Sequence, residues 1–328
     1  MTNNTSHRVE RRFKMMGGPA CIVIDTAKRP FDNYEPLLDA LLAELTCLET
    51  KYSRFRTDSL ISTINRRAGS GIPTEIDTEM STLLNFAGEL WATSGGLFDI
   101  TSGVLRKAWD FQRGGNASPT QLAECLPKVG WDLVEYKNDA IYLPLQGMQI
   151  DLGGIVKEYA ADCVAASIRE AGITSALIEL AGDVVVIGGQ GNGKPWQIGI
   201  RDPDSSGSLL TLSLQDAAVA TSGNYARTIK YNGRALSHFL NPRTGWPVNG
   251  PITVSVLDQR CLTAGAIATV ACLKTDSHAQ TWLEEAGLPW LMMKSCGALI
   301  DTLTNPVSQR ESLTRVPAAV EHQCLMLL

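Results

Sequence analysis

Residues 149–189 read QIDLGGIVKEYAADCVAASIREAGITSALIELAGDVVVIGG, and they contain a helical pattern followed by two apolar strands. After the first glycine pair, apolar side chains recur every three or four positions, which predicts a helix that ends at Gly172. Segments 175–180 and 184–189 are strand patterns joined by a turn at 181–183. A separate helix beside hairpin-like strands is typical of an α+β fold rather than of a βαβ repeat.

The rest of the chain shows the same mixture of patterns. Helices are predicted over 35–50, where leucines form one stripe, over 83–94, which stops at Gly95-Gly96, and over 264–273. Strands are predicted over 21–25, 149–151, 196–203, 209–216, 218–223, 289–295 and 298–302. We therefore expect mixed or antiparallel sheets with flanking helices, followed by a C-terminal extension at 303–328 whose order the sequence does not indicate.

Composition excludes several classes of protein. The 328 residues carry a net charge of −5, which argues against a broad nucleic-acid surface. The eight cysteines include no CxxC pair, so zinc-knuckle and thioredoxin-like sites lack support. No apolar run reaches the length of a membrane span, and the N-terminus shows no signal-peptide pattern or lipobox. We expect a cytoplasmic protein with one large domain or two lobes.

Four glycine-bearing turns follow apolar segments, at 151–154, 181–183, 221–227 and 241–245. Paired glycines before a helix expose backbone N–H groups that suit a phosphate. Lys157 lies one turn into the predicted helix and could pair with a phosphate or with a carboxylate such as Asp151. Taken alone, the sequence favours Asp151 as a helix cap.

Other candidate residues have two interpretations each. Phe98 is as well explained by the core as by a pocket wall, while Asp99 could hold a polar ring edge. Tyr52 either stacks on an aromatic ligand or packs its ring with the hydroxyl at the surface. Of the four histidines, only His238 lies within a motif, SHFLNPRTG, which favours a chemical role for it.

The order of the motifs resolves these alternatives. FKMMGG, YSRFRTDSLISTIN, GGLFDITSG, DLGGIVKEYAAD, AGDVVVIGG, AVATSGNYAR, SHFLNPRTGWPV and AGAIAT, taken together, resemble the ApbE family of FAD:protein FMN transferases over residues 13–274. The resemblance implies a two-lobed α+β domain, placed here at 13–302, with a flavin cleft between the lobes. It also implies that FAD is cleaved with Mg²⁺ and that FMN is attached to a Ser or Thr of an acceptor flavoprotein, releasing AMP.

The resemblance also assigns roles to individual residues. His238 would be the base that deprotonates the acceptor hydroxyl, and Lys157 and Arg243 would act on the phosphates. Thr244 would shape the loop that carries Arg243. The residues expected to contact FAD are Met16, Tyr52, Leu97, Phe98, Asp99, Asp151, Lys157, Thr221, Ser222 and Phe239.

The implied metal site is where this chain departs from the family pattern. The resemblance implies a backbone carbonyl from the DLGG turn, assigned to Gly154, and the Asp and Thr of an A-D-A-x-x-T segment. Here Thr269 is kept, but Gly265 stands at the position of the Asp. Glu158 stands where Gly usually follows the Lys, and Asn241 and Ala181 replace a usual Asp and Gly. Asp183 and Asp258 are candidate replacement carboxylates.

Three functions are therefore open from the sequence. The first is an FAD:protein FMN transferase. The second is an FAD-binding protein that has lost transfer chemistry, for which Gly265 is the motivating feature. The third is an FAD pyrophosphatase that releases free FMN, because water could replace the acceptor hydroxyl in nearly the same site.

Overall fold

The computed structural model describes residues 8–25, 33–109, 118–225, 228–231 and 234–304. Contacts divide the chain into two compact units, each assembled from three segments. Unit 1 comprises Met1–Glu49, Ile155–Thr221 and Ser255–Ala268, and unit 2 comprises Thr50–Gly154, Ser222–Val254 and Thr269–Leu328. The predicted extension lies outside the described residues, apart from Leu303 and Thr304.

Unit 1 is built on antiparallel strands. Its strands pair in the order β1 (Arg8–Met15), β2 (Gly18–Asp25), β6 (Ala176–Leu180), β7 (Asp183–Ile187), β10 (Ala217–Gly223) and β13 (Thr253–Asp258), and β8 (Trp196–Arg201) pairs with β9 (Ser208–Leu214). Met16 and Gly17 turn the β1–β2 hairpin with φ of 51° and 81°. All five side chains of β7 are buried, so this strand lies at the centre of the unit's core.

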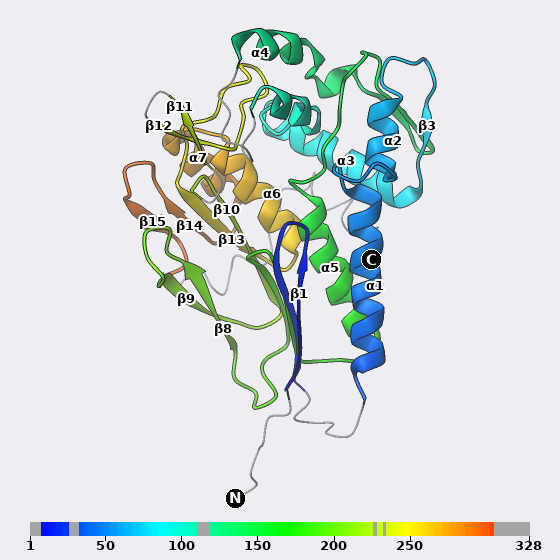
Figure 1. Ribbon diagram of the computed structural model, residues 1–328. Helices are drawn as coiled ribbons and strands as arrows, with labels where there is room; N and C mark the ends of the chain where they lie inside the picture. The colour runs from blue at the N-terminus through cyan, green and yellow to red at the C-terminus, as the bar shows by residue number, and fades with distance from the viewer. Residues whose placement is uncertain (1–7, 26–32, 110–117, 226–227, 232–233, 305–328) are drawn as a thin grey trace, which may run out of the picture. The chain divides into compact units, whose positions relative to one another are not determined.

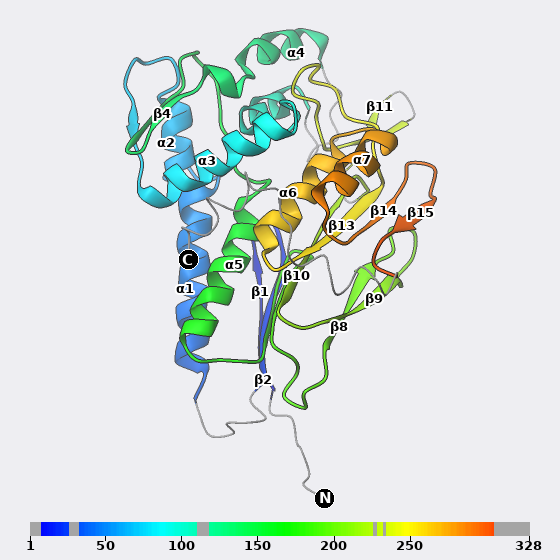
Figure 2. The ribbon, with the colours of Figure 1, turned by 180° about the vertical axis from the view of Figure 1, so that it is seen from behind.

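Helices cover this sheet. α1 (Glu35–Tyr52) and α5 (Val156–Glu170) run side by side in both views (Figures 1 and 2), and Ser167 Oγ on α5 donates to Glu44 on α1 at 2.9 Å. α5 packs on β6 and β7. Four elements, α1, β10, β13 and the apolar helix α6 (Cys261–Cys272), have residues in both units.

Unit 2 contains shorter elements. They are α2 (Leu60–Arg66), α3 (Thr78–Thr93), the 3₁₀ helices η1 (Ile100–Lys107), η2 (Leu126–Lys128) and η3 (Trp131–Leu133), α4 (Pro119–Cys125), α7 (Asp276–Ala286), the sheet β3-β5-β4 (Thr74–Glu75, Ala140–Tyr142, Glu135–Lys137), and the hairpins β11–β12 (Thr228–Tyr231, Arg234–Ser237) and β14–β15 (Trp290–Met293, Leu299–Asp301). One core cluster centres on Trp109, whose indole N–H donates to Gly245 O at 2.7 Å. This bond fixes the loop that follows β12.

The α+β prediction is confirmed by these helices and antiparallel pairings. The flavin cleft between lobes stays a prediction. The strand expected at 149–151 is wrong, because the backbone of Ile150 bonds at both N–H and C=O to the Asn65 side chain on α2. Of the four glycine-bearing turns, only 151–154 leads into a helix. Among the described residues, no helix combines the length and the apolarity that a bilayer crossing needs.

Candidate functional site

Unit 1 holds a buried group of charges at the start of α5. Lys157 Nζ lies 3.2 Å from Glu158 Oε1 and also forms an ion pair with Asp183 Oδ2. Asp183 begins β7, and its other oxygen accepts the N–H of Thr221 at 2.9 Å. The side chains of Lys157, Glu158 and Asp183 are 20%, 6% and 1% exposed. The carboxylates paired with Lys157 are therefore Glu158 and Asp183.

Gly265 of α6 makes room for Glu158. A Cβ at Gly265 would lie 2.4 Å from Glu158 Cγ and 3.0 Å from its Cδ, distances at which carbon atoms overlap. Glu158 Oε2 is buried and has no hydrogen-bond partner among the described residues. A buried carboxylate oxygen without a partner is costly in free energy, so this one calls for a ligand.

The other predicted residues of unit 1 are Met16 and Thr221. Met16 lies in the β1–β2 turn, where its N–H donates to Glu49 at 2.6 Å. The hydroxyl of Thr221 lies 2.8 Å from that of Ser255. Thr221 therefore links the Asp183 carboxylate to β13 within the same unit.

In unit 2, Asp151 is held by arginines. Arg54 donates to its Oδ2 at 2.7 Å, Arg106 lies 3.8 Å from the same oxygen, and Gly153 N donates to Oδ1 at 2.9 Å. Burial acts to raise the pKa of Asp151, but these partners outweigh it and the pKa lies below its ordinary value. The capping prediction for Asp151 is wrong, since α5 has Ile155 at its N-cap and no side-chain cap there.

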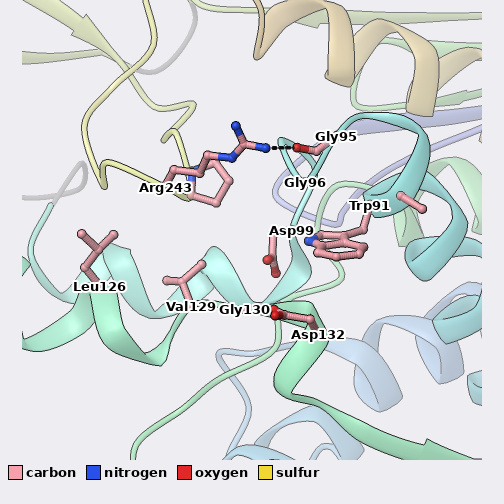
Figure 3. Close-up of a pocket in the computed structure, with 11 residues that line it drawn as sticks. Trp91, Gly95, Gly96, Asp99, Leu126, Val129, Gly130, Asp132 and Arg243 are labelled. Atoms are coloured by element: carbon pink, nitrogen blue, oxygen red, sulfur yellow. Dashed lines mark hydrogen bonds between the residues drawn. The ribbon is translucent and has the colours of Figure 1, made fainter.

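A pocket of about 400 Å³ in unit 2 joins two of the sequence motifs (Figure 3). Its lining comes from the end of α3 and the GGLFD segment, from 126–132, and from the NPRTG loop. The Arg243 guanidinium donates to Gly95 O across it, as the dashed line in Figure 3 marks. The ring of Trp91 and the carboxylate of Asp99 also line the pocket. Its volume falls within the range of small-molecule sites.

Asp99 lines this pocket and also accepts hydrogen bonds from the surrounding backbone. Its Oδ1 accepts Thr101 N at 2.8 Å and its Oδ2 accepts Trp131 N at 3.1 Å. Burial raises its pKa against those hydrogen bonds. The neighbouring Phe98 packs its ring edge against Gly154, where a Cβ would lie 3.1 Å from it. Phe98 is therefore a core residue whose ring leaves little room for a side chain at position 154.

His238 follows β12 in a bend that two motifs stabilise. The hydroxyl of Ser237 donates to Asn224 Oδ1 and accepts Phe239 N at 2.9 Å. Asn224 also donates through its side chain to Pro251 O at 2.6 Å. The His238 and Phe239 rings lie 4.4 Å apart at an angle of 42°. Asn224 of the TSGNY motif and the SHF segment are thus brought together within unit 2.

The structure also brings Ser222 and Thr269 together. Their hydroxyl oxygens lie 2.9 Å apart, and Thr269 is 8% exposed. Leu97 is partly buried in the bend after α3. Tyr52 is 5% exposed and its hydroxyl bonds to Glu79, so its ring packs inside the unit and its contact with flavin stays a prediction.

Sequence reasoning missed several residues of these sites. Trp91 belongs to the apolar stripe of α3, and only the structure shows that it lines a pocket. Asn224 and Ser237 stand inside recognised motifs, but their mutual hydrogen bond joins strand ends that are 13 residues apart. Glu158 stands out in the sequence only as a departure from a pattern. Its contact with Gly265 joins positions on two helices, which no local pattern reveals.

Comparisons with known proteins agree with the motifs. The model of the ApbE family matches residues 16–292. A curated FAD:protein FMN transferase of Treponema pallidum is 30% identical over 281 residues, which cover 80% of this chain and 77% of that protein. A second, of Chlamydia pneumoniae, is 32% identical over 248 residues, covering 73% and 76%.

Solved structures give the same relationship. The flavin transferase ApbE from Vibrio cholerae has a TM-score of 0.80 at 25% identity, over 90% of this chain and 96% of that one. The ApbE protein from Thermotoga maritima has a TM-score of 0.81 at 28% identity, over 93% and 100%. Because the family model spans segments of both units and most of the sequence, this chain belongs to the ApbE family.

Proposed function

We propose that this protein is an FAD:protein FMN transferase. A Ser or Thr hydroxyl of an acceptor protein attacks the FMN-side phosphorus of FAD, a new P–O bond forms, and the P–O bond to AMP breaks. The hydroxyl proton passes to a base, and AMP leaves with the electron pair of the broken bond. Flavin and acceptor end up joined by a phosphoester.

The extent of the match to the transferase relatives carries this proposal. The family model spans 16–292, a range that includes every residue assigned to the site. The Treponema pallidum transferase is covered over 77% of its own length, so the likeness is not confined to a shared subdomain. No specific observation favours a binding protein or a pyrophosphatase over the transferase.

His238 is assigned as the base in this proposal. A neutral hydroxyl attacks phosphorus poorly, and an imidazole within hydrogen-bond reach accepts its proton as the bond forms. Ser237 and Asn224 fix the backbone on the N-terminal side of His238, while Phe239 packs against its ring. The backbone that carries the assigned base is therefore fixed before the substrate arrives.

Each unit holds a cation that its neighbours keep in place, and each is proposed to act on phosphate. In unit 1, Lys157 is oriented by Glu158 and Asp183. In unit 2, Arg243 is anchored on Gly95, and the N–H of Arg243 bonds to Asn241 Oδ1 at 2.9 Å. Cations held in place beforehand stabilise the charge that develops on the phosphoryl oxygens.

The unit 2 pocket is assigned to part of FAD. It offers the aromatic face of Trp91, the carboxylate of Asp99 and the guanidinium of Arg243. The further residues proposed to contact FAD are Met16, Tyr52, Leu97, Phe98, Asp151, Thr221, Ser222 and Phe239. Several of them are buried or paired, and these would position the residues that touch the ligand.

Mg²⁺ fits this chain only if a carboxylate is found for it. The ion would neutralise diphosphate charge when bound. Gly154 could offer its carbonyl and Thr269 its hydroxyl, but Gly265 has no side chain, and Mg²⁺ usually takes one or two carboxylates. The buried, unpartnered oxygen of Glu158 supplies such a group in unit 1.

The test is a transfer assay with separated products. Full-length protein is incubated with FAD, MgCl₂ and an acceptor that the Treponema pallidum relative flavinylates. We expect the acceptor to gain the mass of FMN less one water and AMP to appear in equal amount. Free FMN without an acceptor would instead identify a pyrophosphatase, and FAD binding without AMP a binding protein.

A histidine pair tests the assigned base. His238→Ala should lower the transfer rate by about 10²–10⁴-fold while FAD binding is kept. The matched control is His278→Ala, because His278 lies exposed on α7 and bonds to Thr275. Equal transfer rates for His238→Ala and the wild type would remove His238 from the mechanism.

A further inference from the structure

Glu158 is a buried carboxylate whose hydrogen bonding is incomplete. The residue is 4% exposed, and only Oε1 has a partner, Lys157 Nζ at 3.2 Å. Oε2 is buried without a hydrogen-bond partner among the described residues. Native proteins rarely leave a buried carboxylate oxygen in this condition unless an ordered water, an ion or another ligand completes it.

The surrounding charges do not balance. Two carboxylates, Glu158 and Asp183, share the single ammonium group of Lys157. Asp183 Oδ1 accepts Thr221 N, and its Oδ2 has no hydrogen bond among the described residues but forms an ion pair with Lys157, whereas Glu158 Oε2 has neither kind of partner there. A cation beside Glu158 Oε2 would neutralise the excess negative charge of the group.

Gly265 is what allows the glutamate to lie there. Any Cβ at this position would overlap Glu158 Cγ at 2.4 Å. The sequence departs from the family pattern at both positions, with glycine in place of the Asp on α6 and glutamate in place of the Gly on α5. The carboxylate missing from one helix is therefore present on its neighbour, in the space next to Gly265.

We propose that Glu158 is the carboxylate ligand of the Mg²⁺ ion in this protein, taking the role that position 265 has lost. This inference rests on the proposed transferase function. Mg²⁺ is commonly bound by one or two carboxylates together with substrate phosphates and water.

The proposal is tested by direct metal binding. Full-length protein saturated with FAD is titrated with MnCl₂, and free Mn²⁺ is followed by electron paramagnetic resonance, with calorimetry using MgCl₂ beside it. Glu158→Gln keeps the shape but loses the charge, and we expect it to weaken metal binding roughly tenfold or more. Glu158→Asp should retain part of the affinity.

Asp162→Asn is the matched control. Asp162 lies one turn further along α5 and is a buried carboxylate, but both its oxygens accept backbone N–H groups, from Cys261 at 2.8 Å and Leu262 at 2.9 Å. Removing its charge should leave the metal affinity unchanged. An equal loss in both variants would show a general effect of charge on α5 and would overturn the assignment.

A variant that moves the carboxylate from position 158 to position 265 tests the assignment most specifically. Glu158→Gly should lose metal affinity, and Gly265→Asp alone should be poorly folded because the introduced side chain would overlap Glu158. The double variant Glu158→Gly/Gly265→Asp removes the overlap and returns the carboxylate from the other helix, so it should regain the affinity that Glu158→Gly loses. This arm gives an answer even where Glu158→Gln fails to fold.

The outcomes separate this inference from the proposed function. Wild-type protein that binds FAD and transfers FMN, but whose Glu158→Gln variant binds Mn²⁺ as tightly, would overturn the role of Glu158 alone. A double variant that folds and binds FAD without regaining metal affinity would do the same. A wild-type protein without affinity for FAD would contradict the transferase proposal itself.

Discussion

At the scale of single residues, glycine is needed at position 265 because Glu158 fills the space of a side chain, and not because the backbone there is left-handed. Gly265→Ala would normally stabilise a helix by about 1 kcal/mol. Here the added Cβ meets Glu158 Cγ at 2.4 Å, and overpacking of this kind costs about 1–3 kcal/mol. We expect a net loss of up to about 2 kcal/mol, measured by urea unfolding.

The same substitution in a second background isolates the cause. In Glu158→Ala protein the overlapping atoms are gone, so Gly265→Ala should become neutral or stabilising there. A double-mutant cycle then gives the coupling between the two positions. Equal destabilisation in both backgrounds would place the cause elsewhere than in Glu158.

Asn224 is predicted to act through His238. It accepts the Ser237 hydroxyl and donates to Pro251 O, and these bonds fix the chain just before His238, the proposed base. Asn224→Ala should lower kcat by up to about 100-fold through misplacement of the imidazole, with little change in KM for FAD. Steady-state kinetics check this, and a rise in KM with kcat unchanged would contradict it.

How far the site could be predicted also depends on the kind of residue. His238, Lys157, Asp99 and Arg243 lie inside motifs whose order is readable in the sequence. Asn224 and Glu158 contact partners on other elements, and such contacts cannot be predicted from local sequence patterns. Asp151 shows the opposite error, because its local spacing favours a cap while two arginines hold it.

At the scale of elements, α5 and α6 are joined by Asp162. Its carboxylate accepts the first two N–H groups of α6, and burial raises its pKa to about 6 from 3.8. The carboxyl group of Asp162 therefore binds its proton more tightly in the folded state than in the unfolded state. The resulting contribution to stability is fully present below about pH 4 and is lost as the pH rises through about 6.

The pH dependence is open to a direct check. Free energies of unfolding from urea curves between about pH 4 and pH 7 should include a declining component that Asp162→Asn removes. The wild-type curve minus the variant curve should fall with pH over this window. A difference that stays constant would show that Asp162 keeps an ordinary pKa, and one that rises with pH would show that its pKa is lowered.

Trp109 sets the position of the loop that carries Arg243. Its indole N–H donates to Gly245 O, and its ring centroid lies 5.2 Å from that of Trp246. Trp109→Phe keeps an aromatic core but leaves the buried carbonyl without its donor, which costs about 1–3 kcal/mol. We expect the free energy of unfolding, measured with urea, and the affinity for FAD both to fall. An unchanged FAD affinity would show that the position of this loop does not affect FAD binding.

Helices with a regular apolar pattern are predicted well. Segments whose backbone hydrogen bonds go to side chains are not. The leucine stripe of α1 and the apolar run of α6 identify both helices. The segment at 149–151 has a strand-like composition, yet the Asn65 amide takes the backbone bonds that a neighbouring strand would supply. Tertiary contacts of this kind override a local preference.

At the scale of the whole molecule, each unit is assembled from three separate segments, so its folding depends on contacts distant in sequence. The fold class could be predicted because it follows from local patterns. The positions of the unit boundaries could not, since four of the five pass inside α1, β10, β13 and α6, and the fifth lies between Gly154 and Ile155, just before α5.

FAD is expected to stabilise the folded molecule. A ligand that binds only the native state at about 100 times its Kd adds about 2.7 kcal/mol to the free energy of unfolding. The thermal midpoint of the full chain should therefore rise with FAD concentration. FMN and AMP, added separately as controls, should shift it less, and an unchanged midpoint in FAD would contradict binding to the native state.

The crowding between positions 158 and 265 also constrains the history of this chain. An aspartate at 265 and a glutamate at 158 would bring two negative groups and overlapping carbons into one space. Side chains at the two positions therefore exclude one another. Natural sequences should carry Glu at 158 only where 265 is glycine.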